Sequence, residues 1–282
     1  MARMPALFIG HGSPMNTLEM NGFTRAWRLL GAALPRPRAI LTVSAHWFIG
    51  ATAVTAMARP RTIHDFYGFP KPLFDFEYPA EGAPDVAGEI VEAARPDWVG
   101  LDQDQWGLDH GTWSVLAHLY PQADVPVVQL SINALQPLDY HLALGARLSA
   151  LRDRGVLLLS SGNVVHNLRL IDWSKPMAGA DWARRFDEAA MAQIEEDPAA
   201  ILKLTEHPDF AKAVPTPDHF IPLLYTAAIA AAEGRSQSLI QGYSLGSLSM
   251  TSYNVGPELN LPRGAEGVAD LPDDVSPDQT NI

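Results

Sequence analysis

Histidines carry the main chemical signal in this chain of 282 residues, which has nine of them and no cysteine. Imidazole nitrogens bind transition metals and also transfer protons near neutral pH. Without thiolates, a bound metal needs histidine or carboxylate ligands, which suits zinc, iron(II) or manganese and excludes iron–sulfur clusters. A lone histidine is more often structural, but five of them end apolar runs or lie beside glycine and proline turns: His11, His46, His110, His166 and His219.

Apolar runs that alternate with helical patterns would bring these histidines together. Strands are expected at 5–10, 38–47, 51–57, 125–132 and 155–162, and a strand pair within 238–253. Helices are expected near 23–34, 84–95, 138–153, 179–196, 198–205 and 218–232, whereas His110 is expected in a loop. The pattern predicts an α/β fold, a single domain with a largely parallel or mixed central sheet flanked by helices.

The predicted sheet gives the histidines a common location. Neighbouring parallel strands present their carboxyl ends at the same sheet edge, where ligands bind in such folds. His11 ends the first predicted strand and His46 ends the second, one βαβ crossover later. We therefore expect a metal site at the strand carboxyl ends, where these two side chains converge.

Composition narrows the possible partners and the location. The formal net charge of −12 argues against nucleic acid or an anionic membrane as a partner. No apolar run approaches the roughly 20 residues that span a bilayer. The apolar region at the start of the chain is also too short for a secretory signal peptide. A cytoplasmic protein is predicted.

One long segment, residues 58–82, has neither helical nor strand periodicity and is rich in aromatic residues and proline. Long loops without regular structure inside a domain are usually functional or disordered, and the aromatic content argues against disorder. We expect this segment to line or cover a pocket. The alternative is that its aromatic side chains close a small satellite core.

Six motifs occur along the chain in the order FIGHGSPMN, ILTVSAHW, IHDFYGFP, LDHGTW, SSGNVVHNL and PDHFIPLLY. Together they resemble the DODA-type extradiol aromatic ring-opening dioxygenases of the LigB-like class III extradiol superfamily. The resemblance covers nearly all of residues 5–255. It implies a catalytic domain at residues 1–262. The acidic composition of residues 263–282, which lie outside the resemblance, predicts a C-terminal extension that is mobile or drapes over a neighbour.

The resemblance also implies a role for each candidate residue. His11, His46 and His219 are implied as metal ligands. His166 is either a fourth ligand or the acid–base residue, and His110 is a second proton donor. Asp218 is either a ligand or an acceptor for an imidazole N–H. The substrate wall is formed by His64, Asp65, Phe66 and Tyr67.

The implied reaction opens a small aromatic diol, a DOPA-like or other substituted catechol, with O2 to a muconic semialdehyde. Fe(II) is the implied catalytic cofactor, and Zn(II) can occupy the same site as purified. No reducing cofactor is needed, in agreement with the lack of a G-x-G-x-x-G fingerprint. Three alternatives remain open from the residues: a zinc-dependent hydrolase, a tetrapyrrole metal chelatase, and a non-catalytic binding protein of this fold.

Overall fold

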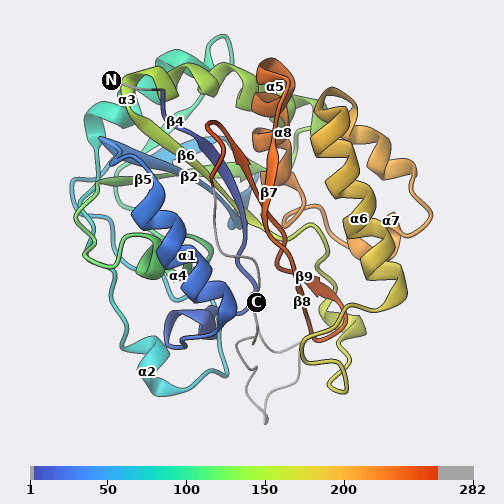
Figure 1. Ribbon diagram of the computed structural model, residues 1–282. Helices are drawn as coiled ribbons and strands as arrows, with labels where there is room; N and C mark the ends of the chain where they lie inside the picture. The colour runs from blue at the N-terminus through green and yellow to red at the C-terminus, as the bar shows by residue number, and fades with distance from the viewer. Residues whose placement is uncertain (1–2, 260–282) are drawn as a thin grey trace.

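A mixed eight-stranded sheet forms the centre of the computed structural model, which describes residues 3–259 (Figure 1). The fold class predicted from the sequence is confirmed. The strand order across the sheet is β4 (Gly100–Asp102), β3 (Ala53–Thr55), β5 (Val127–Asn133), β2 (Ala39–Ile49), β6 (Val156–Gly162), β1 (Ala6–Gly10), β10 (Ser252–Val255) and β7 (Gln237–Ile240).

The four central strands β5, β2, β6 and β1 run parallel. Every residue of β1, β5 and β6 is buried, which explains why these segments read as unbroken apolar runs. Antiparallel pairs flank this core, with β3 against β5 on one side and β10 between β1 and β7 on the other. The carboxyl ends of the four central strands therefore share one edge of the sheet.

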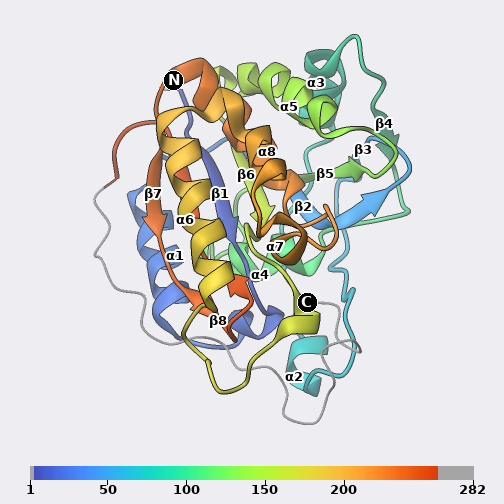
Figure 2. The same ribbon diagram turned by 90° about the vertical axis from the view of Figure 1, so that its right-hand side faces the viewer.

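Helices cover both faces of the sheet (Figures 1 and 2). One apolar cluster joins the sheet to α3 (Pro84–Ala94), α5 (Leu138–Leu148), α6 (Asp181–Glu196) and α8 (Ile221–Glu233). The cluster on the opposite face involves α1 (Gly22–Ala33) and α4 (His110–Leu119). The smaller elements are α2 (Lys71–Phe74), α7 (Phe210–Ala213), four 3-10 helices (Pro14–Thr17, Ser149–Arg154, Leu168–Leu170, Pro198–Glu206) and a second sheet of β8 (Tyr243–Ser244) and β9 (Leu248–Ser249).

The structure corrects several expected elements. The prediction that His110 lies in a loop is wrong, because His110 is the first residue of α4. The helix expected over 138–153 continues as a 3-10 helix after Leu148, the one expected at 198–205 is a 3-10 helix, and the strand pair expected within 238–253 is four short strands. Strand β4 was not predicted.

Two further expectations concern the ends of the chain and the membrane. The proposed acidic extension at 263–282 lies outside the described residues. Within residues 3–259, no helix combines the length and the hydrophobicity that crossing a bilayer requires.

Candidate metal centre

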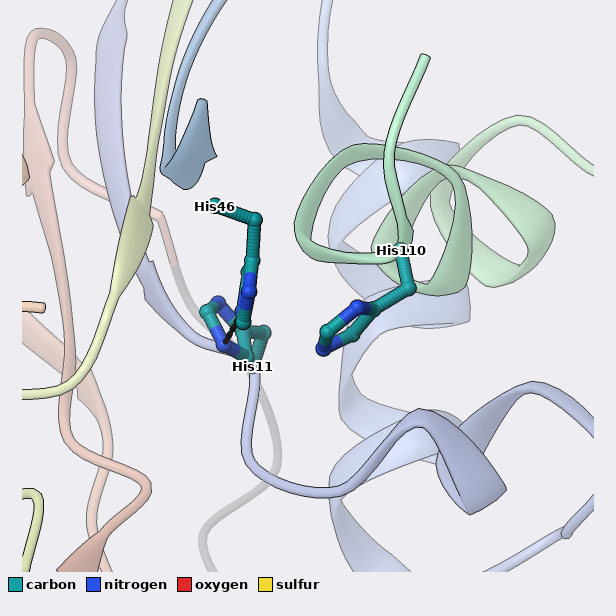
Figure 3. A group of neighbouring side chains, drawn as sticks. All are labelled: His11, His46 and His110. Atoms are coloured by element: carbon teal, nitrogen blue, oxygen red, sulfur yellow. Dashed lines mark hydrogen bonds between the residues drawn. The ribbon is translucent and has the colours of Figure 1, made fainter. Parts of the chain in front are cut away.

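The first pair of histidines comes from β1 and β2, two parallel strands that are separated in the sheet by β6. His11 directly follows β1, and His46 lies near the end of β2. The register of β2 against β5 shifts between Val43 and Phe48, an irregularity of the kind that re-aims side chains. The Nε2 atoms of His11 and His46 lie 3.2 Å apart (Figure 3). The predicted convergence of these two rings is therefore present in the structure.

Three more imidazoles complete the cluster. His110, at the first position of α4, points toward His11 and His46 (Figure 3), and its ring centroid lies 3.8 Å from that of His46. His219, just before α8, has its ring centroid 4.9 Å from His46 and 5.3 Å from His11. His166, which follows β6, stacks on His219 at 3.5 Å. The structure thus brings together all five histidines that the sequence singled out.

Close backbone packing holds the His219 segment against the sheet. A Cβ at Gly162, the last residue of β6, would collide with the carbonyl oxygen of His219. The next residue, Asn163, donates its backbone N–H to that same oxygen at 3.0 Å. Because Gly162 has no side chain, the backbone of His219 can lie against the end of β6, and its imidazole reaches the strand ends.

The partner of His11 fixes where its ring proton lies. His11 Nδ1 is 2.9 Å from the Ser161 hydroxyl, and that hydroxyl donates its own hydrogen to the Gly111 carbonyl at 2.5 Å. Ser161 Oγ can therefore only accept from His11, so Nδ1 carries the hydrogen and Nε2 carries the lone pair.

Carboxylates accept the ring hydrogen of two further imidazoles, and one of these carboxylates also lies close to His46. Asp65 Oδ1 accepts from His110 Nδ1 at 2.9 Å, and Asp65 Oδ2 lies 3.2 Å from His46 Nδ1. Asp218 accepts from His219 Nδ1. Asp65 and Asp218 hold a hydrogen on Nδ1 of His110 and His219, which leaves the lone pair of these two rings on Nε2. The contact between Asp65 Oδ2 and His46 Nδ1 lacks hydrogen-bond geometry. The Nε2 atoms of His110 and His219 are buried and have no hydrogen-bond partner.

This donor set fits a metal ion. At 3.2 Å, His46 Nε2 can donate a hydrogen to the lone pair of His11 Nε2, and a metal ion between the two atoms would replace that hydrogen. Nitrogens bound 2.0–2.1 Å from one ion, at angles from 90° to tetrahedral, lie about 2.9 to 3.4 Å apart. One ring nitrogen each from His11, His46 and His110 lies within 4.8 Å of the other two. The family resemblance implies His219 in place of His110, and both rings have a suitable Nε2.

Electrostatics keeps the two central rings neutral, as metal ligands must be. Burial, followed by the neighbouring imidazoles of His219 and His110, holds the pKa of His11 well below its usual value. Burial and then His110 and His219 have the same effect on the pKa of His46. Burial alone would raise the pKa of Asp218, but the adjacent His219 ring lowers it well below its usual range, so this carboxylate is ionised.

A buried polar network lies beneath His46 and His110. Asp109 caps α4 and accepts a hydrogen bond from Ser44 Oγ at 2.6 Å, and Ser44 Oγ accepts from the backbone N–H of His46 at 3.2 Å. Burial and the nearby carboxylate of Asp65 raise the pKa of Asp109 to about 6. The network joins the end of β2 to the start of α4, the two elements that carry His46 and His110.

The other candidate residues of the aromatic segment differ in their exposure and in their contacts. Phe66 is only 4% exposed and packs on His110 and Trp113, as a core residue would. His64 Nε2 lies 2.9 Å from the carbonyl oxygen of Phe76. Tyr67 is 54% exposed. Of the four residues predicted to form a substrate wall, Tyr67 is thus the one with a largely accessible ring.

Sequence reasoning missed two supporting residues. Ser161 was not singled out, although a pair of serines at the carboxyl end of the apolar run VLLLSSG is a signal that could have found it. Asp109 also went unnoticed, although an Asp one residue before the helix is an ordinary capping signal.

Comparison with known proteins identifies the architecture. The sequence-family model described as the catalytic LigB subunit of aromatic ring-opening dioxygenase matches residues 6–255 of this chain. The chain belongs to the LigB family. The family recognised from the sequence motifs is thereby confirmed, and this LigB-family protein is an extradiol ring-opening dioxygenase with a candidate metal-binding site of histidines.

Individual relatives of this LigB-family chain span nearly its whole length. The 4,5-DOPA dioxygenase extradiol of Escherichia coli (strain K12) is 48% identical over 262 residues, covering 90% of this chain and 95% of that protein. The protein of the same name from Beta vulgaris is 33% identical over 257 residues, covering 87% and 94%. The crystal structure of an uncharacterized Escherichia coli K12 protein aligns with a TM-score of 0.77 and 43% identity, covering 90% of this chain and all of that one.

Proposed function

We propose that this protein is an iron(II)-dependent extradiol dioxygenase that opens the ring of a DOPA-like catechol with O2 to give a muconic semialdehyde. His11, His46 and His219 are the proposed metal ligands. His166 is a fourth ligand or the acid–base residue, and His110 is the second residue that exchanges protons with the substrate.

The observation that carries the proposal is the common orientation of three rings around His46. Each of His11, His110 and His219 has a hydrogen-bond acceptor at Nδ1 and therefore holds its lone pair at Nε2, and the Nε2 atom of His46 lies 3.2 Å from that of His11. A set of neutral nitrogen donors with no cysteine suits iron(II) among the metals of dioxygenases. Bound iron(II) would supply the Lewis acidity that makes a catechol easier to deprotonate and the redox chemistry that dioxygen needs.

The chain's own histidines would move the protons. His110 holds its lone pair at Nε2, where it can accept a proton from a catechol hydroxyl. Asp65 at Nδ1 would stabilise the imidazolium that forms, as a buried carboxylate does beside a general base. His166, stacked on His219, lies beside the proposed ligands and can exchange a second proton there.

The names of the relatives support the substrate class. Proteins called 4,5-DOPA dioxygenase extradiol from bacterial and plant sources align with nearly the full chain. An aromatic diol also suits an accessible aromatic ring such as Tyr67, which we keep as a substrate contact. We place cleavage of DOPA at the 4,5 position.

The test is to remove the metal, reload iron(II) without oxygen, and follow oxygen uptake with a panel of catechols that includes DOPA. Uptake of one O2 for each yellow ring-opened product is the expected result. Absence of uptake with every catechol, at full iron occupancy, would overturn the proposal. Reloading with zinc(II) is the matched control and should give no oxygen uptake, because zinc has no redox chemistry.

A further inference from the structure

Asp65 connects the aromatic segment 58–82 to two of the site histidines. Its Oδ1 lies 2.9 Å from His110 Nδ1 and accepts the backbone N–H of His110 at 3.0 Å. Its Oδ2 lies 3.2 Å from His46 Nδ1. The side chain is 8% exposed. Both oxygens of the carboxylate thus face imidazoles, whereas the sequence suggested that this residue contacts the substrate.

We propose that Asp65 is a positioning residue that holds the ring hydrogen of His110 on Nδ1 and, when a metal takes the lone pair of His46 Nε2, accepts the hydrogen that then remains on His46 Nδ1. The proposal rests on the function proposed above only in that the centre binds a metal. Asp65 acts through the two histidines and does not itself touch the reacting atoms.

Hydrogen-bond chemistry gives the reason. A neutral imidazole carries one hydrogen, and an ionised carboxylate can only accept, so it selects the form with the hydrogen on Nδ1. In the other form the hydrogen on Nε2 would point at the metal and prevent coordination. Carboxylates that accept from a ligating histidine commonly fix its orientation and raise its basicity. One carboxylate that serves two rings couples their orientations.

The residues beside Asp65 are anchored, so its carboxylate is held in place. The backbone carbonyl of Ile63 accepts from Trp113 Nε1 at 2.8 Å. His64 Nε2 lies 2.9 Å from the carbonyl oxygen of Phe76, and Phe66 packs on His110 with ring centroids 5.5 Å apart. These contacts fix the segment on both sides of Asp65. The segment therefore serves the metal centre as a rigid support.

Two substitutions separate the possible outcomes. Asp65→Asn keeps the size of the side chain but has one acceptor oxygen, and its NH2 group would face one of the two Nδ1–H groups. Asp65→Ala removes both acceptors. Asp75→Asn is the matched control, because Asp75 lies in the same segment, is 57% exposed and pairs with Lys71.

The experiment measures zinc(II) affinity by competition with a chelator, together with nitrogen-15 NMR of histidine in the zinc-loaded protein. We expect Asp65→Asn and Asp65→Ala to weaken zinc binding by about 10- to 100-fold. The protonated Nδ1 signals of His46 and His110 should shift or disappear, while Asp75→Asn leaves affinity and signals unchanged. Wild-type affinity and unshifted Nδ1 signals in both Asp65 variants would overturn the proposal.

Folding and function are tested separately. Circular dichroism checks that each variant is folded, and if Asp65→Ala is not, the isosteric Asp65→Asn decides the question by the same two readouts. Neither readout uses a catechol or oxygen. A wild-type protein that takes up no oxygen would therefore contradict the proposed function, yet it would leave the result for Asp65 intact.

Discussion

The rings of the cluster have different groups at Nδ1, and this difference affects the charge of the site. His11 has a neutral hydroxyl there, Asp65 accepts from His110 and lies 3.2 Å from His46 Nδ1, and Asp218 accepts from His219. Two carboxylates beside the proposed ligands would balance the charge of a divalent cation. A buried charge is tolerated when it is compensated in this way.

Replacing His11 by Ala removes one of the two nitrogens that lie 3.2 Å apart. The protein is expected to fold but to lose nearly all bound metal, because the remaining donors no longer enclose the ion from the β1 side. Metal content per chain, measured by plasma mass spectrometry, checks this expectation. His207→Ala is the control, since His207 packs against Phe186 away from the cluster, and a full metal complement in His11→Ala would refute the ligand assignment.

Replacing His166 by Ala tests a different role. If His166 exchanges protons with the substrate, the variant keeps its metal while turnover falls by about 10²- to 10⁴-fold. The measurements are metal content and the rate of oxygen uptake at saturating catechol. Complete loss of metal in this variant would make His166 a ligand instead.

At the scale of elements, the site depends on how closely α4 approaches β2. A Cβ at Gly111 would collide with the hydroxyl of Ser44 and lie 2.9 Å from His46 Cδ2. The second residue of α4 therefore has no room for a side chain. The same packing sets the distance between the rings of His46 and His110.

We expect Gly111→Ala to weaken metal binding, because the helix must shift or His46 must rotate. The loss should be at least about tenfold, as large as the loss that follows removal of a residue supporting a metal ligand. Gly88→Ala in α3 is the matched control. A Cβ at Gly88 meets nothing within 4 Å, so alanine should stabilise that helix by about 0.5 to 1 kcal/mol. Urea unfolding and chelator competition on both variants provide the test, and equal metal affinity in the two would contradict it.

The elements differ in how far the sequence predicts them. Strands β1, β5 and β6 were predictable because short, fully buried apolar runs end at turn residues. Helix α4 was missed because nearly all its residues are buried, so no polar face marks a helical period.

The site shows the same contrast. Strand-end histidines were predictable to converge, because parallel strands align their carboxyl ends. The contacts of Asp65 depend on the path of a long segment without periodicity, and local sequence patterns do not encode such a path.

At the scale of the whole molecule, a buried acid joins α6 to the last strands of the sheet. Asp187 is 1% exposed and accepts a hydrogen bond from Thr251 Oγ1 at 2.6 Å. Burial raises the pKa of Asp187 from 3.8 to about 6, although hydrogen bonds from Thr251 and Tyr243 act in the opposite direction. The folded protein therefore keeps the proton on Asp187 up to a higher pH than the unfolded chain does.

This shift predicts how stability depends on pH. Between about pH 4 and pH 6 the unfolded chain has released the proton and the folded protein still holds it, so the free energy of unfolding falls as pH rises. The asparagine side chain in Asp187→Asn is neutral at every pH, so the variant does not show this fall in the free energy of unfolding. Relative to wild type, the variant should gain up to about 3 kcal/mol between pH 4 and pH 7. Urea unfolding at both pH values measures the difference, and a pH-independent difference would contradict the prediction.

The pairing of β1 with β10 has a consequence for the order of assembly during synthesis. Strand β1, which directly precedes His11, is made first, but it pairs with β6 and with β10, whose residues are made much later. His219 also comes late in the chain, just before α8. A chain that emerges from the ribosome in order can therefore close the histidine cluster only when synthesis is well advanced. We therefore expect a metal ion to meet the complete set of histidines only after the segment that carries His219 has been made.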